Sequence, residues 1–143
     1  MLRNISPILS PDVLWTLRAM GHGDDLVIAD ANFPATALGA RCHRIDGLPA
    51  TDVLEAVLAV LPLDRFVPDP AVVMEVVDDI DAVPPVVSAF QDITTATADN
   101  PATLGKMERF AFYERAKSAF AIIQTGETRL YGNIILKKGV IGT

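Results

Sequence analysis

The residues of this chain that could do chemistry are groups that exchange protons or bind hydroxyls. They are His22, Asp30, Arg109, Tyr113, Tyr131 and Asn133. The imidazole of a histidine can give and take protons near neutral pH, because its ordinary pKa is about 6.5. The other five side chains donate or accept hydrogen bonds in ways that suit several hydroxyl groups at once. The set therefore favours acid–base chemistry on a small molecule rich in hydroxyl groups.

Other kinds of catalytic site lack their motifs. The sequence has no phosphate-binding loop, dinucleotide fingerprint or serine elbow, and no pair of cysteines or histidines at metal-ligand spacing. The acidic cluster at Asp78, Asp79 and Asp81 lacks the spacing and the glycine of a calcium loop. We therefore expect neither a metal nor a cofactor.

Composition limits the partners and the location. The formal charge of −6 comes from 12 basic and 18 acidic residues, without a basic stripe, which argues against nucleic acid. No apolar stretch approaches the ~20 residues of a membrane span, and residues 1–7 do not resemble a signal peptide. Cys42 is the single cysteine, so no internal disulfide is expected. We expect a cytoplasmic protein that contacts no membrane, and the 50% hydrophobic content favours an oligomer.

The segment that positions His22 and Asp30 is a helix, a glycine-flanked loop and a strand. Ser10 is expected to cap a helix that ends near Met20, with Gly21 as its left-handed cap. The apolar run 26–29 then predicts a strand buried on both faces, with Asp30 at its carboxyl end, where α/β sheets place ligands. A straight strand separates its ends by roughly 13 Å. His22 therefore meets Asp30 only if the loop folds back or if the site forms across subunits.

The remaining chain alternates between strand and helix patterns. We expect strands at 41–45, 71–77, 120–124 and 129–138, the last two paired as a hairpin through the turn at 125–128. We expect helices at 86–93 and 109–118, and another from a Thr51 cap to Leu61. This order predicts a layered α/β fold in a single domain, residues 1–143.

Several motifs together resemble one known family. They include Ser10-Pro11, Met20-Gly21-His22-Gly23-Asp24, Asp30-Ala31, Phe33-Pro34-Ala35, Arg109-Phe110-Ala111-Phe112-Tyr113-Glu114-Arg115-Ala116, Thr125-Gly126-Glu127 and Tyr131-Gly132-Asn133-Ile134. The chain is similar to the L-fucose mutarotase branch of the sugar mutarotase and ribose pyranase family. The resemblance spans nearly the whole chain, and it is most specific at the two ends. Residues 53–107 match in length and character more than in sequence.

The resemblance implies a function, an assembly and a set of roles. It implies a three-layer α/β/α fold with a mainly buried mixed sheet. It also implies pentameric rings that pair into a homodecamer, with each active site shared between neighbouring subunits. His22 matches the family's proton donor, and the sugar-binding positions match Asp30, Arg109, Tyr131, Gly132 and Asn133; we add Tyr113 for its residue type. Asn32 stands where the fucose branch commonly has histidine, which leaves the identity of the sugar open. Arg109 and Gly132 differ from the histidine and alanine of the ribose branch.

The expected reaction is mutarotation, the exchange of the α and β anomers of L-fucose or a related reducing monosaccharide by ring opening. It is an isomerisation that needs no cofactor. Two alternatives remain. The chain could be a D-ribose pyranase, which exchanges pyranose and furanose rings, or a sugar-binding subunit without catalysis.

Overall fold

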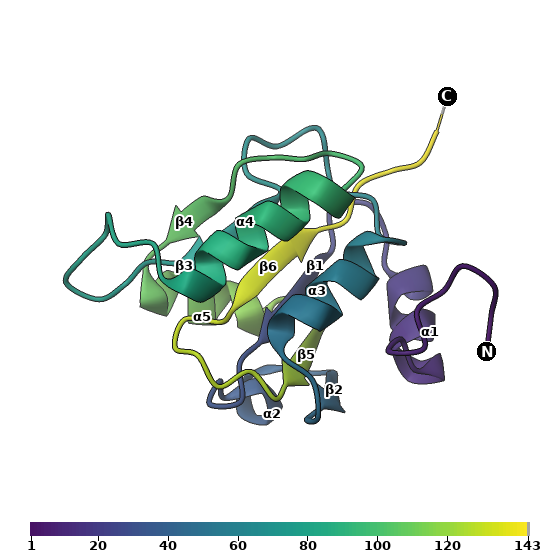
Figure 1. Cartoon of the computed structure of the whole chain (residues 1–143), viewed down its shortest axis with the longest axis horizontal. Helices are drawn as coiled ribbons and strands as arrows, with labels where there is room; N and C mark the ends of the chain where they lie inside the picture. Colours follow the sequence, from purple (N-terminus) through teal and green to yellow (C-terminus); the bar gives the residue numbers. More distant parts are fainter. Residues whose placement is uncertain (143) are drawn as a thin grey trace.

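A mixed six-stranded sheet forms the centre of the protein in the computed structural model, which describes residues 1–142 (Figure 1). Its strands are β1 (Asp25–Ala29), β2 (Cys42–Ile45), β3 (Ala71–Met74), β4 (Gly105–Met107), β5 (Ala121–Thr125) and β6 (Ile134–Lys137). They lie in the order β2-β5-β1-β6-β3-β4. Strand β6 is antiparallel to both of its neighbours, and the other pairs are parallel. The predicted mixed sheet is confirmed.

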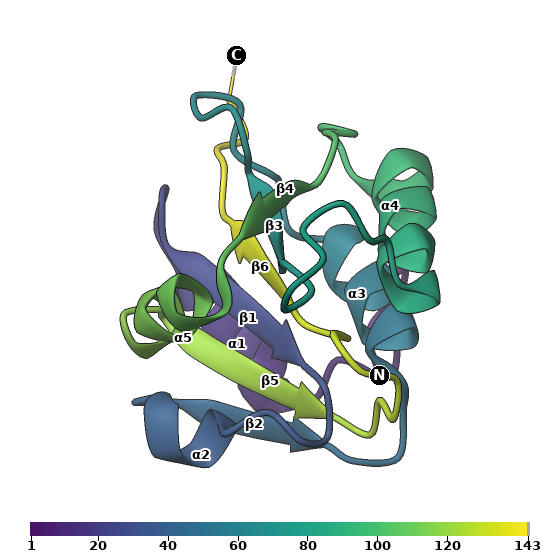
Figure 2. The ribbon, with the colours of Figure 1, turned by 90° about the vertical axis from the view of Figure 1, so that its left-hand side faces the viewer.

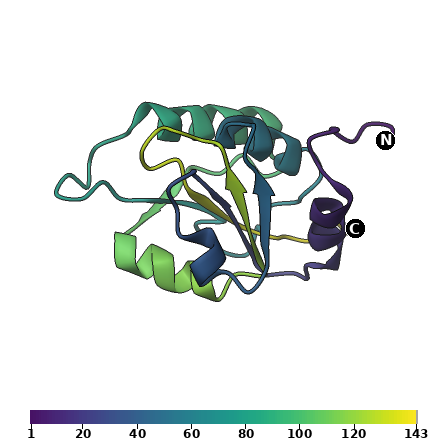
Figure 3. The ribbon, with the colours of Figure 1, turned by 90° about the horizontal axis from the view of Figure 1, so that it is seen from below.

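Helices cover both faces of this sheet. They are α1 (Pro11–Ala19), α2 (Ala35–Leu38), α3 (Ala50–Leu58), α4 (Pro85–Thr97) and α5 (Arg109–Lys117). Helices α3 and α4 lie on one face, and α2 and α5 on the other (Figures 2 and 3). Helix α1 lies beside one end of the sheet (Figure 3). None of the helices within residues 1–142 is long and apolar enough to span a bilayer.

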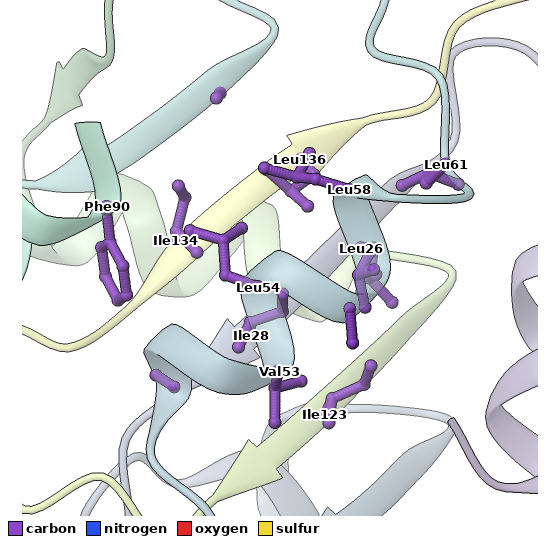
Figure 4. Packing of buried hydrophobic residues seen from close by; sticks show 14 of the residues in the cluster. Leu26, Ile28, Val53, Leu54, Leu58, Leu61, Phe90, Ile123, Ile134 and Leu136 are labelled. Carbon is purple, nitrogen blue, oxygen red and sulfur yellow. The ribbon is translucent and has the colours of Figure 1, made fainter. Parts of the chain in front are cut away.

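Two apolar cores result from the alternation of side chains along the strands. In β1, Leu26 and Ile28 point toward α3 and α4, where they pack with Leu54 (Figure 4). Val27 faces α5 instead and belongs to the core around Phe112. All of these side chains are fully buried, as a strand covered on both faces requires. This burial fixes β1 near the middle of the sheet, and Asp30 follows at its carboxyl end.

The predicted hairpin between the last two strands is wrong. Strands β5 and β6 do not pair, because β1 lies between them and bonds to both. The connection at 126–133 instead passes the carboxyl end of β1, where the carbonyl of Glu127 accepts the N–H of Ala31. The turn residues at 125–128 indicate only that the chain leaves β5. The strand with which β6 pairs is β1, which lies about a hundred residues earlier in the sequence.

The end of α1 also differs from expectation. Gly21 is not a left-handed cap, because Gly23 is the only glycine within residues 1–142 with positive φ, at 85°. Met20 leaves the helix with φ of −56° and ψ of 138°, outside the helical region. The Nζ of Lys138 donates instead to the carbonyls of Leu17 and Met20, at 2.7 and 2.6 Å. A lysine that is distant in the sequence thus satisfies helix-end carbonyls that a glycine motif often satisfies.

At the start of α3, too, a residue distant in the sequence takes the place of the expected local cap. Thr51 is not its cap: the helix begins at Ala50, and no side chain of the preceding residue caps it. The buried carboxylate of Glu127 accepts the N–H of Ala50 at 3.3 Å. Strand β4 was not predicted, because its three residues are too few for a pattern.

Candidate active site

A pocket of about 200 Å³ opens at the carboxyl end of β1. It is lined by Asp30, Asn32, Phe33, Met74, Arg109, Tyr113, Leu130, Tyr131 and Asn133. These residues come from the loop after β1, from β3, from α5 and from the connection that leads into β6. Five of the site residues predicted from the sequence therefore lie around one cavity.

Asp30 and Asn133 form the buried base of the pocket. Their exposed fractions are 6% and 4%. The Nδ2 of Asn133 donates to Oδ2 of Asp30 at 2.9 Å, and its Oδ1 accepts the backbone N–H of Asp30 at 2.8 Å. The other carboxylate oxygen accepts the N–H of Asn32 at 2.9 Å. These bonds hold the carboxylate in one orientation and leave lone pairs on both oxygens for ligand hydroxyls.

Tyr131 and Gly132 form a strained turn beside this pair. Tyr131 has a φ of 65°, which is rare for a bulky residue and marks a conformation imposed by its surroundings. Its hydroxyl accepts the N–H of Val77 at 3.1 Å. A Cβ on Gly132 would lie 2.6 Å from Cγ of Glu127 and 3.4 Å from Cβ of Asp30. Only glycine lets the backbone pass this close to the pocket.

Helix α5 contributes Arg109 and Tyr113, which are one turn apart on the same face. The guanidinium carbon of Arg109 lies 4.7 Å from the centre of the Phe110 ring. Its Nε is buried and has no hydrogen-bond partner within residues 1–142. An unpaired buried donor costs about 1–3 kcal/mol, so a ligand oxygen that accepts from it is favoured. The Tyr113 ring packs against Phe33 at 5.5 Å.

His22 lies at the opposite end of β1, on a tight turn from Gly21 to Asp24. The N–H of Asp24 donates to the carbonyl of Gly21 at 3.2 Å. The positive φ of Gly23 at the third position makes glycine the suitable residue there. The imidazole side chain is 46% exposed and does not line the pocket. Within one chain, the loop does not fold back to Asp30.

Asp64 is the functional candidate that sequence reasoning missed. Its side chain is 3% exposed, and its Oδ1 accepts from Nε2 of His22 at 3.1 Å. Burial raises the pKa of Asp64, but hydrogen bonds from the Phe66 N–H and from His22 outweigh burial and hold it below its usual value. With Nε2 bonded to Asp64, Nδ1 is the ring nitrogen that remains for a ligand. The two residues are 42 positions apart, so no local pattern could have found the pair.

The molecule thus carries two polar groupings on different surfaces. One is the pocket, where carboxylate, amide, guanidinium and phenol groups meet, and the other is the imidazole–carboxylate pair of His22 and Asp64. Each adjoins exposed apolar side chains: Phe66 packs against the His22 ring, and Leu130 lines the pocket. No group of three or more histidine, cysteine or acidic residues within residues 1–142 could hold a metal ion.

Comparisons with known proteins agree with this architecture. The family model described as the RbsD / FucU transport protein family matches residues 3–141. The chain is 49% identical to a fucose mutarotase of Bos taurus, over 99% of this chain and 95% of the relative. It is 40% identical to a crystallised fucose mutarotase of Streptococcus pneumoniae in complex with L-fucose. That alignment has a TM-score of 0.91 and covers 99% of this chain and 100% of the other.

A more distant structure shares the fold. Bacillus subtilis RbsD, crystallised with D-ribose, is 19% identical, with a TM-score of 0.73 and coverage of 99% of this chain and 100% of the other. The family match and the identities above extend over almost the entire sequence. The chain belongs to the RbsD / FucU transport protein family.

Proposed function

We propose that this protein is a mutarotase, an isomerase that interconverts the α and β anomers of L-fucose or a closely related reducing monosaccharide. The observation that carries the proposal is the near full-length similarity, at 49% and 40% identity, to proteins named fucose mutarotase. The Asp30 pocket supports it, because carboxylate, amide, guanidinium and phenol groups meet there. We treat residues 1–143 as one sugar mutarotase and ribose pyranase-like domain.

The reaction opens and recloses a hemiacetal. The ring oxygen gains a proton, the anomeric hydroxyl releases one to water, and the bond between the anomeric carbon and the ring oxygen breaks. Rotation of the free carbonyl and reclosure on its other face give the other anomer. Protons in and out balance, and no electrons are transferred, so no cofactor takes part. Positioned acid–base catalysis contributes about 10²–10⁴-fold, which suits a reaction that already occurs in water.

His22 is the proton donor in this mechanism, and the pocket holds the sugar. The carboxylate of Asp30 accepts a sugar hydroxyl, and Arg109 donates to hydroxyl oxygens through its planar fork. The remaining hydrogen bonds come from Asn133, from the phenols of Tyr113 and Tyr131 and from the backbone at Gly132. Asn32 lines the pocket where the fucose branch commonly has histidine, and for that reason the proposal includes sugars related to L-fucose.

We further propose that His22 acts on sugar bound by a neighbouring copy. Support comes from the separation of the two groupings at opposite ends of β1 and from the exposed Phe66 and Leu130 beside them. Contact between two different patches is heterologous, and repeated heterologous contacts form a ring when the rotation between neighbouring copies closes. The proposed assembly is two pentameric rings paired as a homodecamer. We propose the cytoplasm as its location, in keeping with a single cysteine and no internal disulfide.

Asp64 is a positioning residue in this proposal, because it orients the His22 ring. Asp64→Asn keeps the size of the side chain but removes its charge, and misplacement of a catalytic group by about 1 Å can cost about 100-fold in rate. We expect kcat to fall by about 10–100-fold with little change in KM. Asp99→Asn is the matched control, since Asp99 accepts the N–H of Leu63 in the same loop without contacting His22. Equal losses in both variants would make Asp64 a loop anchor only.

The proposed function is tested by nuclear magnetic resonance saturation transfer between anomeric signals, on a panel that includes L-fucose and D-ribose. We expect faster anomer exchange for L-fucose or a close analogue, and loss of the acceleration in His22→Ala without loss of assembly. Acceleration of ribose ring exchange alone would make the protein a ribose pyranase. Binding without acceleration would make it a sugar-binding subunit, and retained activity in His22→Ala would exclude that residue as the acid.

A further inference from the structure

Lys138, the residue after β6, touches the His22 turn on both sides. Its Nζ donates to the Met20 carbonyl at 2.6 Å, immediately before the turn. Its backbone carbonyl accepts the N–H of Gly23, and its N–H donates to the Asp24 carbonyl, both at 2.9 Å. One residue is therefore hydrogen-bonded to the chain just before His22 and just after it.

The ammonium group has a specific reason to be there. The last carbonyls of a helix have no partners within the helix and carry partial negative charge. Lys138 donates to two of them, at Leu17 and Met20, and its side chain is partly buried. Burial, with nearby Arg18, lowers the pKa of Lys138, and the nearby Asp24 carboxylate opposes that shift. Two short bonds to carbonyls are what such a partly buried cation requires.

The partner of His22 is fastened to the same end of β6. The N–H of Asp64 donates to the carbonyl of Lys137 at 3.0 Å. The imidazole and the carboxylate that binds it are therefore both held by the consecutive residues Lys137 and Lys138. The 3.1 Å contact between His22 and Asp64 therefore depends on the end of β6. Of the bonds that join Lys138 to the chain around His22, a substitution can remove only those of the ammonium group, because the others are made by backbone atoms.

We propose that Lys138 is a positioning residue for proton transfer: its ammonium group holds the turn that presents His22, and it has no part in binding the sugar. This inference rests on the proposed role of His22. Lys138 does not line the Asp30 pocket, so its loss is expected to change kcat rather than sugar affinity.

The test compares Lys138→Met with two other variants of the full chain. We expect Lys138→Met to assemble, to bind L-fucose within about twofold of wild type and to lose about tenfold or more in kcat. Lys138→Arg, which still donates to carbonyls, is expected to recover most of the rate. Lys106→Met is the matched control, because Lys106 also donates to two carbonyls, at Ile80 and Ala82, away from His22. Wild-type kcat in Lys138→Met, or an equal loss in the control, would overturn the inference.

Amide hydrogen exchange separates this inference from the proposed function. The Gly23 N–H should exchange about tenfold faster or more in Lys138→Met, whereas the Ile123 N–H in β5 should not change. Equal Gly23 exchange in both proteins would overturn the positioning role. A wild-type protein that accelerates no anomer exchange would refute the mutarotase proposal but leave the amide test valid. If Lys138→Met does not fold, Lys138→Gln, which keeps one amide donor, is measured in the same way.

Discussion

Asn133→Asp is the change that most sharply tests the buried base of the pocket. The substitution preserves shape but replaces the Nδ2 donor by a second carboxylate oxygen, 2.9 Å from Oδ2 of Asp30. Both residues are at least nine-tenths buried, so water does not screen the new contact. Two carboxylates this close cannot both ionise, and the pair therefore retains a proton that neither group would hold alone.

The size of the effect follows from these contacts. A hydrogen bond to a charged group contributes about 1.5–3 kcal/mol, and holding one proton at pH 7 adds to the loss. We expect a total destabilisation of about 2–4 kcal/mol at pH 7. This corresponds to a fall in Tm of roughly 5–15 °C for a domain of this size. The pKa of the variant's carboxyl pair is raised by folding, so the destabilisation grows as the pH rises through that value and shrinks on acidification.

The assay is thermal unfolding at pH 7 and pH 5, with binding of L-fucose measured in parallel. Asn133→Asp should lie closer to wild type at pH 5 than at pH 7. Asn32→Asp is the control, because it makes the same chemical change at an exposed position two residues from Asp30. A wild-type Tm at pH 7, or a deficit that grows toward pH 5, would refute the assignment of Asp30 and Asn133 as a hydrogen-bonded pair.

Two further substitutions test contacts around the strand and the pocket. Burial raises the pKa of Asp25, but hydrogen bonds from Arg115 and Lys137 outweigh burial and hold that pKa below its usual value. The Asp25 carboxylate therefore stabilises the fold above about pH 4, and this stabilisation is lost as the pH falls through the lowered pKa. Asp25→Asn should therefore cost about 1–3 kcal/mol in urea unfolding at pH 7 and less near pH 3; an undiminished cost at pH 3 would contradict this. Gly132→Ala forces its Cβ against Glu127 and should cost about 1–3 kcal/mol and weaken sugar binding by calorimetry; unchanged stability and affinity would show that the turn yields.

The sequence predicts the parts of the fold whose signals are local. Ser10 accepts the N–H of Val13 at the start of α1, as its residue type indicates. The apolar run 26–29 forms a strand buried on both faces, with Asp30 just beyond it. Asp30 and Asn133 lie together although they are 103 positions apart in the sequence. Only the family resemblance, and not their spacing, connected these two in advance.

The parts that could not be predicted depend on partners far along the chain. Gly21 follows an apolar helix and is the residue type expected at a helix end. The ammonium group of Lys138 nevertheless donates to the carbonyls at the end of this helix. Asp64 lies in a loop rich in proline and aspartate, where exposure is the ordinary expectation, but it is buried against His22. Pairing of β6 with β1 rather than β5 is likewise decided by the assembled sheet. Tertiary contacts override local preference at these three places.

The most direct test of a site shared between copies is a hybrid assembly of two inactive variants. His22→Ala and Asp30→Asn chains are unfolded, refolded together in equal amounts and assayed for anomer exchange. If His22 of one copy serves the Asp30 pocket of the next, about one quarter of the random interfaces contain both intact groups, and about a quarter of the wild-type rate returns. Hybrids confirmed by native mass spectrometry that stay as inactive as either parent would contradict a shared site.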